Sequence, residues 1–216
     1  MEPRVDAVLA ASSLAPSALL AALSRFATGR EAKLLCPFVA AATDVPALAE
    51  LSLDAFGEEA LSAATFRRRI VRGNALAFGL RDSEGIAAYL LLYLHRRTLR
   101  AYIHEALVVA PWRGRRLSTC PLAAAEGAAS AAGMATLSAH VRVGNAPSLQ
   151  GKLRQGMVIV GRLPAWYTDH EDAFYLRQRL RPFAAGNSRQ FRLWLRAQRG
   201  VRPEGSPPLA RGRARG

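Results

Sequence analysis

The sequence has few cysteines and no long apolar run. Its two cysteines, Cys36 and Cys120, form neither a metal-ligand spacing nor a disulfide framework, so we expect a reducing compartment and no structural metal. No apolar run approaches the roughly 20 residues of a membrane-spanning helix, and Glu2 and Asp6 lie where a secretory signal would be positively charged. These absences predict a globular protein of the cytoplasm with no membrane partner; a divergent organelle address is the alternative.

Lysine is also scarce, although the net charge is +14. Lys33 and Lys152 are the two lysines, so arginine supplies almost all of the positive charge. Residues 181–216 contain nine arginines against the single acid Glu204, which places +8 of the net charge in this segment. The composition of an arginine-rich genome accounts for this excess, and a basic arm that contacts RNA or the ribosome is the alternative. The chain has no RRM, KH or OB signature that would favour RNA.

The composition of the chain and the positions of its glycines and prolines predict one domain with two extensions. Residues 1–33 form an N-terminal extension whose leucines have helical spacing, and residues 34–181 form the domain. Residues 182–216 form an Arg-rich tail, in which we expect one helix over 189–198 and disorder elsewhere.

The domain alternates strands and helices. Short apolar runs rich in β-branched and aromatic residues predict strands at 34–41, 75–80, 86–94, 101–109, 136–141, 157–163 and 173–180. Helical spacing predicts helices at 45–56, 59–72, 118–132 and 147–155, the first of them capped by Thr43-Asp44. The order of these elements indicates an α/β protein.

The centre of the chain joins a buried strand, a basic turn and an Ala-rich helix. Pro111 ends the strand, the turn holds three arginines, and Ser118 or Thr119 is placed to cap the helix. The free N–H groups of the first helical turn and the positive end of the helix dipole favour an anion above the turn. A ligand with a pyrophosphate is therefore expected here.

Three blocks of this sequence resemble one enzyme family in the same order. The first is Glu105-Ala-Leu-Val-Val-Ala-Pro-Trp-Arg-Gly-Arg-Arg-Leu-Ser, which is similar to the acyl-CoA motif of the GNAT N-acetyltransferases. The second is Leu137-Ser-Ala-His-Val-Arg-Val-Gly-Asn, followed by Gly156-Met. The third, Trp166-Tyr-Thr-Asp-His-Glu-Asp-Ala, resembles the end of RimI-like N-terminal acetyltransferases. The resemblance covers about residues 37–180.

The resemblance implies the GNAT fold, a central, mixed and mostly antiparallel sheet flanked by helices, with acyl-CoA bound between two splayed strands. It implies transfer of acetyl from acetyl-CoA to an amine, above all a protein N-terminal amine, by direct attack in a ternary complex without a metal. Arg116, Ser118, Lys152 and Met157 replace residues of the family pattern. The alternative is therefore a degenerate GNAT domain that binds acyl-CoA or a protein or ribosome partner without catalysis.

The resemblance assigns the acetyl-CoA site to the end of the central strand, the basic turn and the start of a later helix. Glycine is usual where Arg116 stands because phosphate must approach the backbone closely. The residues implied are Leu107, Val108, Val109, Arg113, Gly114, Arg115, Arg116, Leu117, Ser118 and Asn145. For Asn145, capping of the helix is a sufficient alternative.

Three residues are implied as catalytic. Glu105 matches a general base of the family, and by simple alternation it shares a strand face with Ile103, Leu107 and Val109; a carboxylate at a sheet edge paired with an arginine is the alternative. His140 is a second candidate base, and packing or exposure on a strand is the alternative. Lys152 stands where relatives carry a proton-donating tyrosine, and an exposed helix lysine is the alternative.

The acceptor side is implied by the third block. Tyr167 and Glu171 match residues with which relatives grip a peptide N-terminus. As ordinary loop residues they would need no such role.

Overall fold

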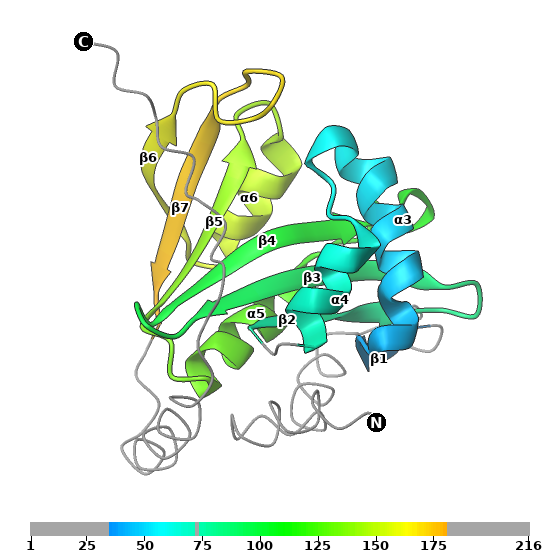
Figure 1. The fold of residues 1–216 in the computed structure, drawn as a ribbon. Coiled ribbons are helices and arrows are strands. Elements are labelled where there is room, and N and C mark those ends of the chain that lie inside the picture. The colour runs from blue at the N-terminus through cyan, green and yellow to red at the C-terminus, as the bar shows by residue number, and fades with distance from the viewer. Residues whose placement is uncertain (1–34, 72–73, 181–216) are drawn as a thin grey trace.

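The computed structural model describes residues 35–71 and 74–180. Within them, seven strands form one sheet in the order β1-β2-β3-β4-β5-β7-β6 (Figure 1). Every neighbouring pair is antiparallel except β4 and β5, which run parallel. The strands are β1 (Cys36–Val39), β2 (Ala75–Arg81), β3 (Ile86–His95), β4 (Arg100–Val108), β5 (Thr136–Arg142), β6 (Val158–Leu163) and β7 (Ala173–Arg179). The mixed, mostly antiparallel sheet that we expected is confirmed.

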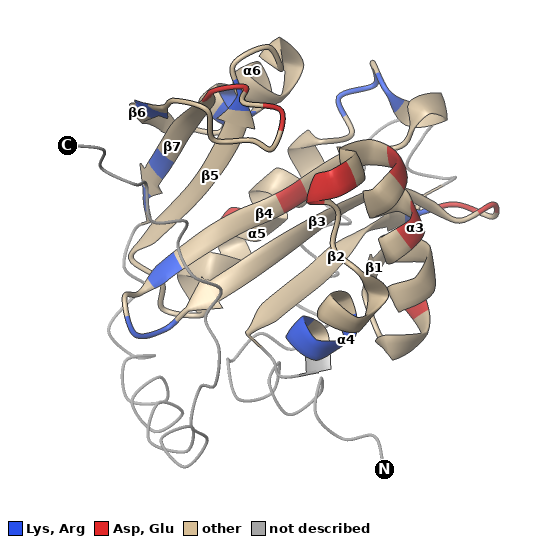
Figure 2. Ribbon diagram, turned by 45° about the horizontal axis from the view of Figure 1, so that its top comes forward, with Lys and Arg blue, Asp and Glu red and all other residues tan. Residues whose placement is uncertain are grey.

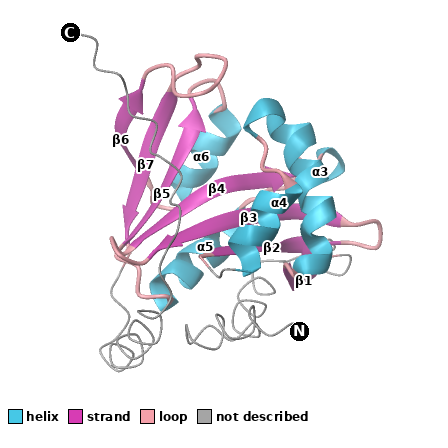
Figure 3. Cartoon of the chain, in the orientation of Figure 1, coloured by secondary structure: helices cyan, strands magenta, loops and turns pink. Residues whose placement is uncertain are grey.

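Helices cover both faces of the sheet (Figure 3). They are α3 (Val45–Phe56), α4 (Ala63–Val71), α5 (Thr119–Ala131) and α6 (Ala146–Arg154), with short 3-10 turns η2 (Ala42–Asp44), η3 (Gly57–Glu59) and η4 (Ala110–Trp112). Leu90 and Leu92 of β3 belong to one core with α5, while Tyr89 and Leu91 belong to a second core with α3 and α4. Strand β3 is therefore buried on both faces, which explains its continuous apolar sequence. No helix in the described ranges is long and apolar enough to span a bilayer.

The predicted elements are confirmed in order, with two local differences. The second helix begins at Ala63, because α3 ends at Phe56, Gly57 after it has a φ of 55°, and residues 57–59 form η3 instead. Asp44 does not cap α3; its carboxylate accepts from the Ala41 N–H at 2.8 Å and so closes the preceding turn. The helices predicted within residues 1–33 and at 189–198 lie outside the described residues.

Strands β4 and β5 separate after a short pairing. They pair over four positions only, from Arg100 with Thr136 to Ile103 with Ala139. Beyond these positions the two strands diverge, and the sheet opens into a V beside α6 (Figure 1). The opening begins where β4 shifts its register against β3, with Leu91 opposite Glu105 and Leu92 opposite Ile103. This β-bulge adds one residue to β4 and bends it away from its neighbour.

Candidate active site

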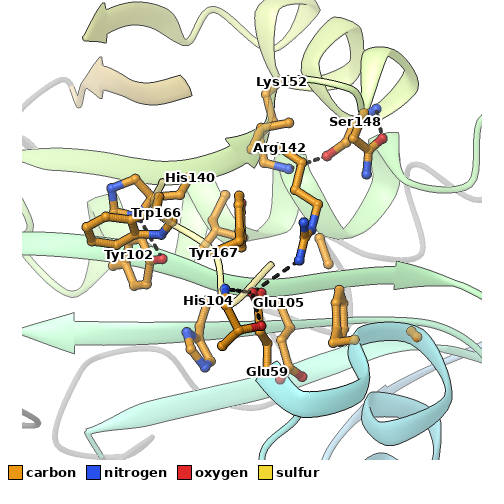
Figure 4. Close-up of a pocket in the computed structure, with 17 residues that line it drawn as sticks. Glu59, Tyr102, His104, Glu105, His140, Arg142, Ser148, Lys152, Trp166 and Tyr167 are labelled. Carbon is orange, nitrogen blue, oxygen red and sulfur yellow. Dashed lines mark hydrogen bonds and ion pairs between the residues drawn. The ribbon is translucent and has the colours of Figure 1, made fainter. Parts of the chain in front are cut away.

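A pocket of about 410 Å³ lies where β4 and β5 diverge (Figure 4). Its walls come from β4, β5, α6, the end of α3 with η3, and the loop between β6 and β7. Five residues proposed from the sequence line it: Glu105, His140, Asn145, Lys152 and Tyr167. The structure thus brings together residues from four separate segments of the chain.

The β-bulge in β4 decides which way Glu105 faces. Ile103 belongs to the core under α5, whereas Glu105 bonds to residues of the opposite face. The prediction that Glu105 and Ile103 share a face of β4 is therefore wrong. His104 is an extra residue in β4, so the alternation of side chains between the two faces is shifted by one residue after it. The prediction that Glu105 shares a face with Leu107 is confirmed, because Leu107 packs on the α3 side of the sheet.

Glu105 is held by two hydroxyl groups. It is 5% exposed, and it accepts hydrogen bonds from Ser52 Oγ at 2.9 Å and from Tyr89 OH at 2.8 Å. The Leu61 N–H donates to Ser52 Oγ, which leaves the hydroxyl hydrogen of Ser52 for Glu105. Burial raises the pKa of Glu105, and the hydrogen bonds from Tyr89 and Ser52 oppose that rise.

The alternative of an ion-paired carboxylate at a sheet edge is wrong for Glu105. Strand β4 is the fourth of seven in the sheet. Within the described ranges, no arginine, lysine or histidine forms an ion pair with Glu105. The carboxylate therefore faces the pocket with its charge stabilised by neutral hydrogen-bond donors, the hydroxyl groups of Ser52 and Tyr89 and the backbone N–H of Leu61.

His140 faces the same pocket from β5, inside an aromatic cluster. Its Nδ1 lies 2.9 Å from the Tyr102 hydroxyl, and its ring lies 4.4 Å from Trp166 and 5.0 Å from Tyr175, between centroids. Burial, with a smaller contribution from Arg100, lowers the pKa of His140 to about 4. The imidazole is therefore neutral at neutral pH and able to accept a proton.

Sequence reasoning missed Tyr102 and His104, which also line the pocket. Strict alternation places Tyr102 on the face opposite Glu105, and the bulge puts both on one face. The His104 ring stacks on Tyr93 at 4.7 Å, and its buried Nε2 has no hydrogen-bond partner within the described ranges. No sequence signal marks a bulge, since it arises from pairing with β3.

Lys152 reaches the pocket from α6. It is 5% exposed, so the expectation of an exposed helix lysine is wrong. Its Nζ donates to Ser148 Oγ at 2.9 Å, one turn earlier on the helix. Burial lowers the pKa of Lys152 to about 8. Figure 4 places Lys152 on the α6 side of the pocket and Glu105 on the β4 side.

Asn145 begins the helix that carries Lys152. Its Oδ1 accepts from the Ser148 N–H at 3.1 Å, so the expected capping role is confirmed. Because Asn145 also lines the pocket, it can contact a ligand through its side-chain NH₂ while it caps the helix.

The basic turn lies between η4 and α5 and does not line the pocket. Gly114 and Arg116 both have left-handed backbone conformations, with φ of 78° and 58°. Glycine adopts this conformation at no steric cost, which gives a physical reason for glycine at the position of Arg116 in the family pattern. Arg116 keeps the same turn geometry at a modest energetic cost.

The predicted cap of α5 is wrong. Ser118 is itself helical, with φ −61° and ψ −23°, and makes no capping hydrogen bond. The Thr119 and Cys120 N–H groups donate instead to the carbonyls of Arg116 and Leu117, at 3.0 and 3.3 Å. The turn thus runs continuously into the helix, and pyrophosphate binding there stays a prediction.

The other predicted acetyl-CoA residues surround this turn. Arg113 Nε donates to the Val108 carbonyl at 3.0 Å, which ties the turn to the end of β4. The Arg115 guanidinium lies over the Trp112 ring at 5.0 Å. Leu107, Val108 and Val109 are half-buried and lie outside the pocket lining.

Arg142 organises the side of the pocket that η3 and the β6–β7 loop form. Its guanidinium lies 3.9 Å from the centre of the Tyr167 ring and forms ion pairs with Glu59, Asp169 and Glu171 at 3.1, 2.7 and 2.9 Å. Figure 2 shows acidic residues of η3, β4 and the β6–β7 loop near this end of the sheet.

Glu171 belongs to this ion-pair cluster and not to the pocket lining. Besides Arg142 it accepts from the Gly144 N–H at 2.8 Å, so it braces the turn before α6. Sequence reasoning missed Glu59 and Arg142, which line the pocket where Glu171 was expected. Glu59 also accepts from the Thr168 N–H at 3.0 Å, which links η3 to the β6–β7 loop.

Solved structures of acetyltransferases share this architecture. The ribosomal-protein-S18-alanine N-acetyltransferase of Escherichia coli superposes with a TM-score of 0.61 at 22% identity, over 71% of this chain and 98% of that chain. NAA60 of Arabidopsis thaliana in complex with a bisubstrate analogue has a TM-score of 0.59 at 18% identity, over 67% and 97% of the two chains. The spermidine N-acetyltransferase of Vibrio cholerae in complex with CoA and spermine has a TM-score of 0.59 at 13% identity, over 68% and 96%.

The fold is that of the GNAT N-acetyltransferases. Neither a protein-family model nor a curated protein sequence matches the chain. At these identities the likeness establishes the GNAT fold alone. The reaction has to be inferred from the residues that line the pocket. Within residues 35–71 and 74–180, no group of three or more His, Cys, Asp or Glu side chains is arranged to hold a metal ion.

Proposed function

We propose that this chain is an N-acetyltransferase that moves acetyl from acetyl-CoA to a primary amine. One observation carries the proposal: a carboxylate with a raised pKa and an ammonium with a lowered pKa line one pocket, at the point where β4 and β5 diverge. Acyl transfer to an amine needs a proton acceptor for the incoming ammonium and a proton donor for the leaving thiolate. Glu105 would serve as the proton acceptor and Lys152 as the proton donor.

Glu105 is the proposed base. It removes a proton from the acceptor ammonium, directly or through one water, and the free amine then attacks the thioester carbonyl. His140 also lines the pocket, but its pKa of about 4 makes it the weaker base. Lys152 gives a proton to the departing thiolate, because burial lowers the pKa of its ammonium group to about 8.

The basic turn and α5 are the proposed site for the pyrophosphate of acetyl-CoA. Arg113, Gly114, Arg115, Arg116, Leu117 and Ser118 would surround it, close to the positive end of the α5 dipole. The left-handed backbone at Gly114 and Arg116 supports this assignment, since that geometry turns successive N–H groups toward one side. Asn145 would contact the pantetheine arm, and Leu107 to Val109 would border it.

The proposed acceptor is a protein or peptide N-terminus. Tyr167 lines the pocket beside Arg142, and together with Glu59 it provides aromatic and polar contacts for a short peptide. The likeness to the ribosomal-protein-S18-alanine N-acetyltransferase supports this choice. Glu171 acts through Arg142 in this proposal. The cytoplasmic location and the RNA or ribosome contact of residues 182–216 stay predictions.

Isothermal titration with acetyl-CoA at moderate salt tests the donor site, since salt suppresses loose binding of phosphate to the basic tail. We expect saturable one-to-one binding, weakened by about tenfold or more in Ser118→Asp because a carboxylate there repels the pyrophosphate. Ser83→Asp, an equal charge change in the exposed β2–β3 turn, is the matched control and should bind normally.

Peptide acetylation is then measured by release of free CoA thiol. Turnover with peptide N-termini, and none with peptides blocked at the N-terminus, supports the full proposal. Binding without turnover on peptides or polyamines favours the degenerate domain. Absence of binding at millimolar acetyl-CoA contradicts the donor site itself.

A further inference from the structure

Lys152 differs from every other charged group that lines the pocket. Arg142 pairs with three carboxylates, and Glu59 accepts hydrogen bonds from Arg142 and Thr168. Glu105 has two hydroxyl donors. Lys152 is equally buried, yet its one hydrogen bond goes to Ser148 Oγ, and within the described ranges no carboxylate lies within 4.0 Å of it. The pocket therefore holds one buried amine without a counter-ion.

A buried amine without a counter-ion is chemically reactive. Its burial penalises the ammonium form, and the pKa of about 8 leaves a fraction of Lys152 neutral at physiological pH. A neutral lysine amine is a nucleophile. Lys152 shares its pocket with the proposed base Glu105, so an acyl thioester that enters this pocket meets a second amine besides that of the acceptor.

We propose that Lys152 is a self-acylation site, which takes the acyl group of the chain's own acyl-CoA when no acceptor amine is bound. Nζ attacks the thioester carbonyl carbon, the new C–N bond forms as the C–S bond breaks, and CoA leaves as a thiol with the proton that Nζ loses. The product is an amide that keeps one N–H for Ser148 Oγ. This inference rests on the proposed function, because it requires an acyl-CoA in the same pocket.

Self-acylation switches the pocket off. The amide has no ionisable proton for the leaving thiolate, and the added acetyl group occupies part of a pocket of about 410 Å³. Modification also removes a buried charge that has no counter-ion within the described ranges, so the modified chain loses a destabilising feature. The enzyme would thus be inactivated when donor accumulates without acceptor.

The test is incubation of the full chain with ¹³C-acetyl-CoA and no acceptor, followed by peptide mass spectrometry. The sequence supplies its own control, because Lys33 is the one other lysine. We expect label on Lys152 at least about tenfold faster than on Lys33, and equal, slow labelling of both in urea. Pre-incubated chain should lose most of its peptide acetylation, while Lys152→Arg, which keeps the charge and is not acylated, should show no further loss on pre-incubation.

Two different failures can be told apart by the titration with acetyl-CoA. If the chain binds acetyl-CoA and Lys152 stays unlabelled, or is labelled no faster than Lys33, the self-acylation inference is overturned and the proposed function stands. If the chain does not bind acetyl-CoA, both fall together. Labelling of Lys152 that Ser118→Asp slows and Ser83→Asp leaves unchanged supports both.

Discussion

The wall of the pocket formed by β4 and the wall formed by α6 stabilise a buried charge to different extents. Each presents one buried ionisable group, Glu105 or Lys152, with 5% of its surface exposed. Burial disfavours the charged form of both, which raises the pKa of the acid and lowers that of the base. Two hydroxyls support the carboxylate, while the ammonium has one serine. The carboxylate of the β4 wall therefore has more hydrogen-bond support for its charge than the ammonium of the α6 wall.

The largest expected effect comes from removal of the charge on the β4 wall. Glu105→Gln keeps the size of the side chain and removes its basicity, so we expect kcat/KM to fall by about 10²- to 10⁴-fold. Release of CoA thiol with a peptide acceptor measures this. Glu126→Gln on α5, outside the pocket lining, is the control. Unchanged activity in Glu105→Gln would move the base to His140, with His140→Ala as the next variant.

The second effect is expected at the α6 wall, where removal of the charge should increase stability although activity falls. Lys152→Met removes a buried charge, so we expect the free energy of unfolding at pH 7 to rise by about 1–3 kcal/mol while transfer activity falls. The folded pKa of about 8 lies below the ordinary value of 10.5. Between these values the unfolded chain binds the proton that the folded chain has lost, so the wild type gains stability as pH rises through that window.

Chemical denaturation across pH 7 to 10 measures this difference between Lys152→Met and the wild type. The two curves should converge toward high pH, where Lys152 is neutral in both states. A less stable Lys152→Met at pH 7 would mean that the ammonium is compensated in the folded chain. Lys33→Met serves as the control for loss of one lysine.

The smallest effect is expected from removal of one of the hydroxyl groups that donate to Glu105 on the β4 wall. Tyr89→Phe removes a hydrogen bond that favours the ionised form of Glu105 and should raise its pKa further. Activity rises as Glu105 loses its proton, so the acid limb of the kcat/KM profile should move to higher pH by up to about one unit. Ser52→Ala should move it the same way, and Ser62→Ala, at the exposed start of α4, should not. A shift to lower pH contradicts the arrangement.

Most of the fold is predictable from the sequence because its signals are local. The apolar runs of β2 and β3, the Ala-rich α5 and the Asn145 cap each depend on neighbouring residues, and all are present as expected. The family motifs add the order of the strands and the opening between β4 and β5. These features follow from periodicity, capping and turn chemistry within short windows.

The site is less predictable because its decisive features are not local. The bulge at His104 depends on the register of β4 against β3, so alternation alone assigned Ile103 and Glu105 to the same face. Lys152 lies between Gly151 and Leu153, and neither neighbour marks it as buried; its burial depends on how α6 lies beside the opened sheet. Arg142 meets carboxylates from two distant segments, so no short window contains its partners.

The link between Glu59 and Thr168 bears on the order in which the molecule is assembled. It joins positions 109 residues apart, and nearly the whole sheet must be in place before the two groups can meet. Contacts of such long sequence separation carry a loop-closure cost that is recovered only late in folding. The β1–β4 half, built mainly from hairpins, can form early. We therefore expect the wall formed by η3 and the β6–β7 loop to be the last part of the molecule to form, so a newly made chain would be compact before its pocket is complete.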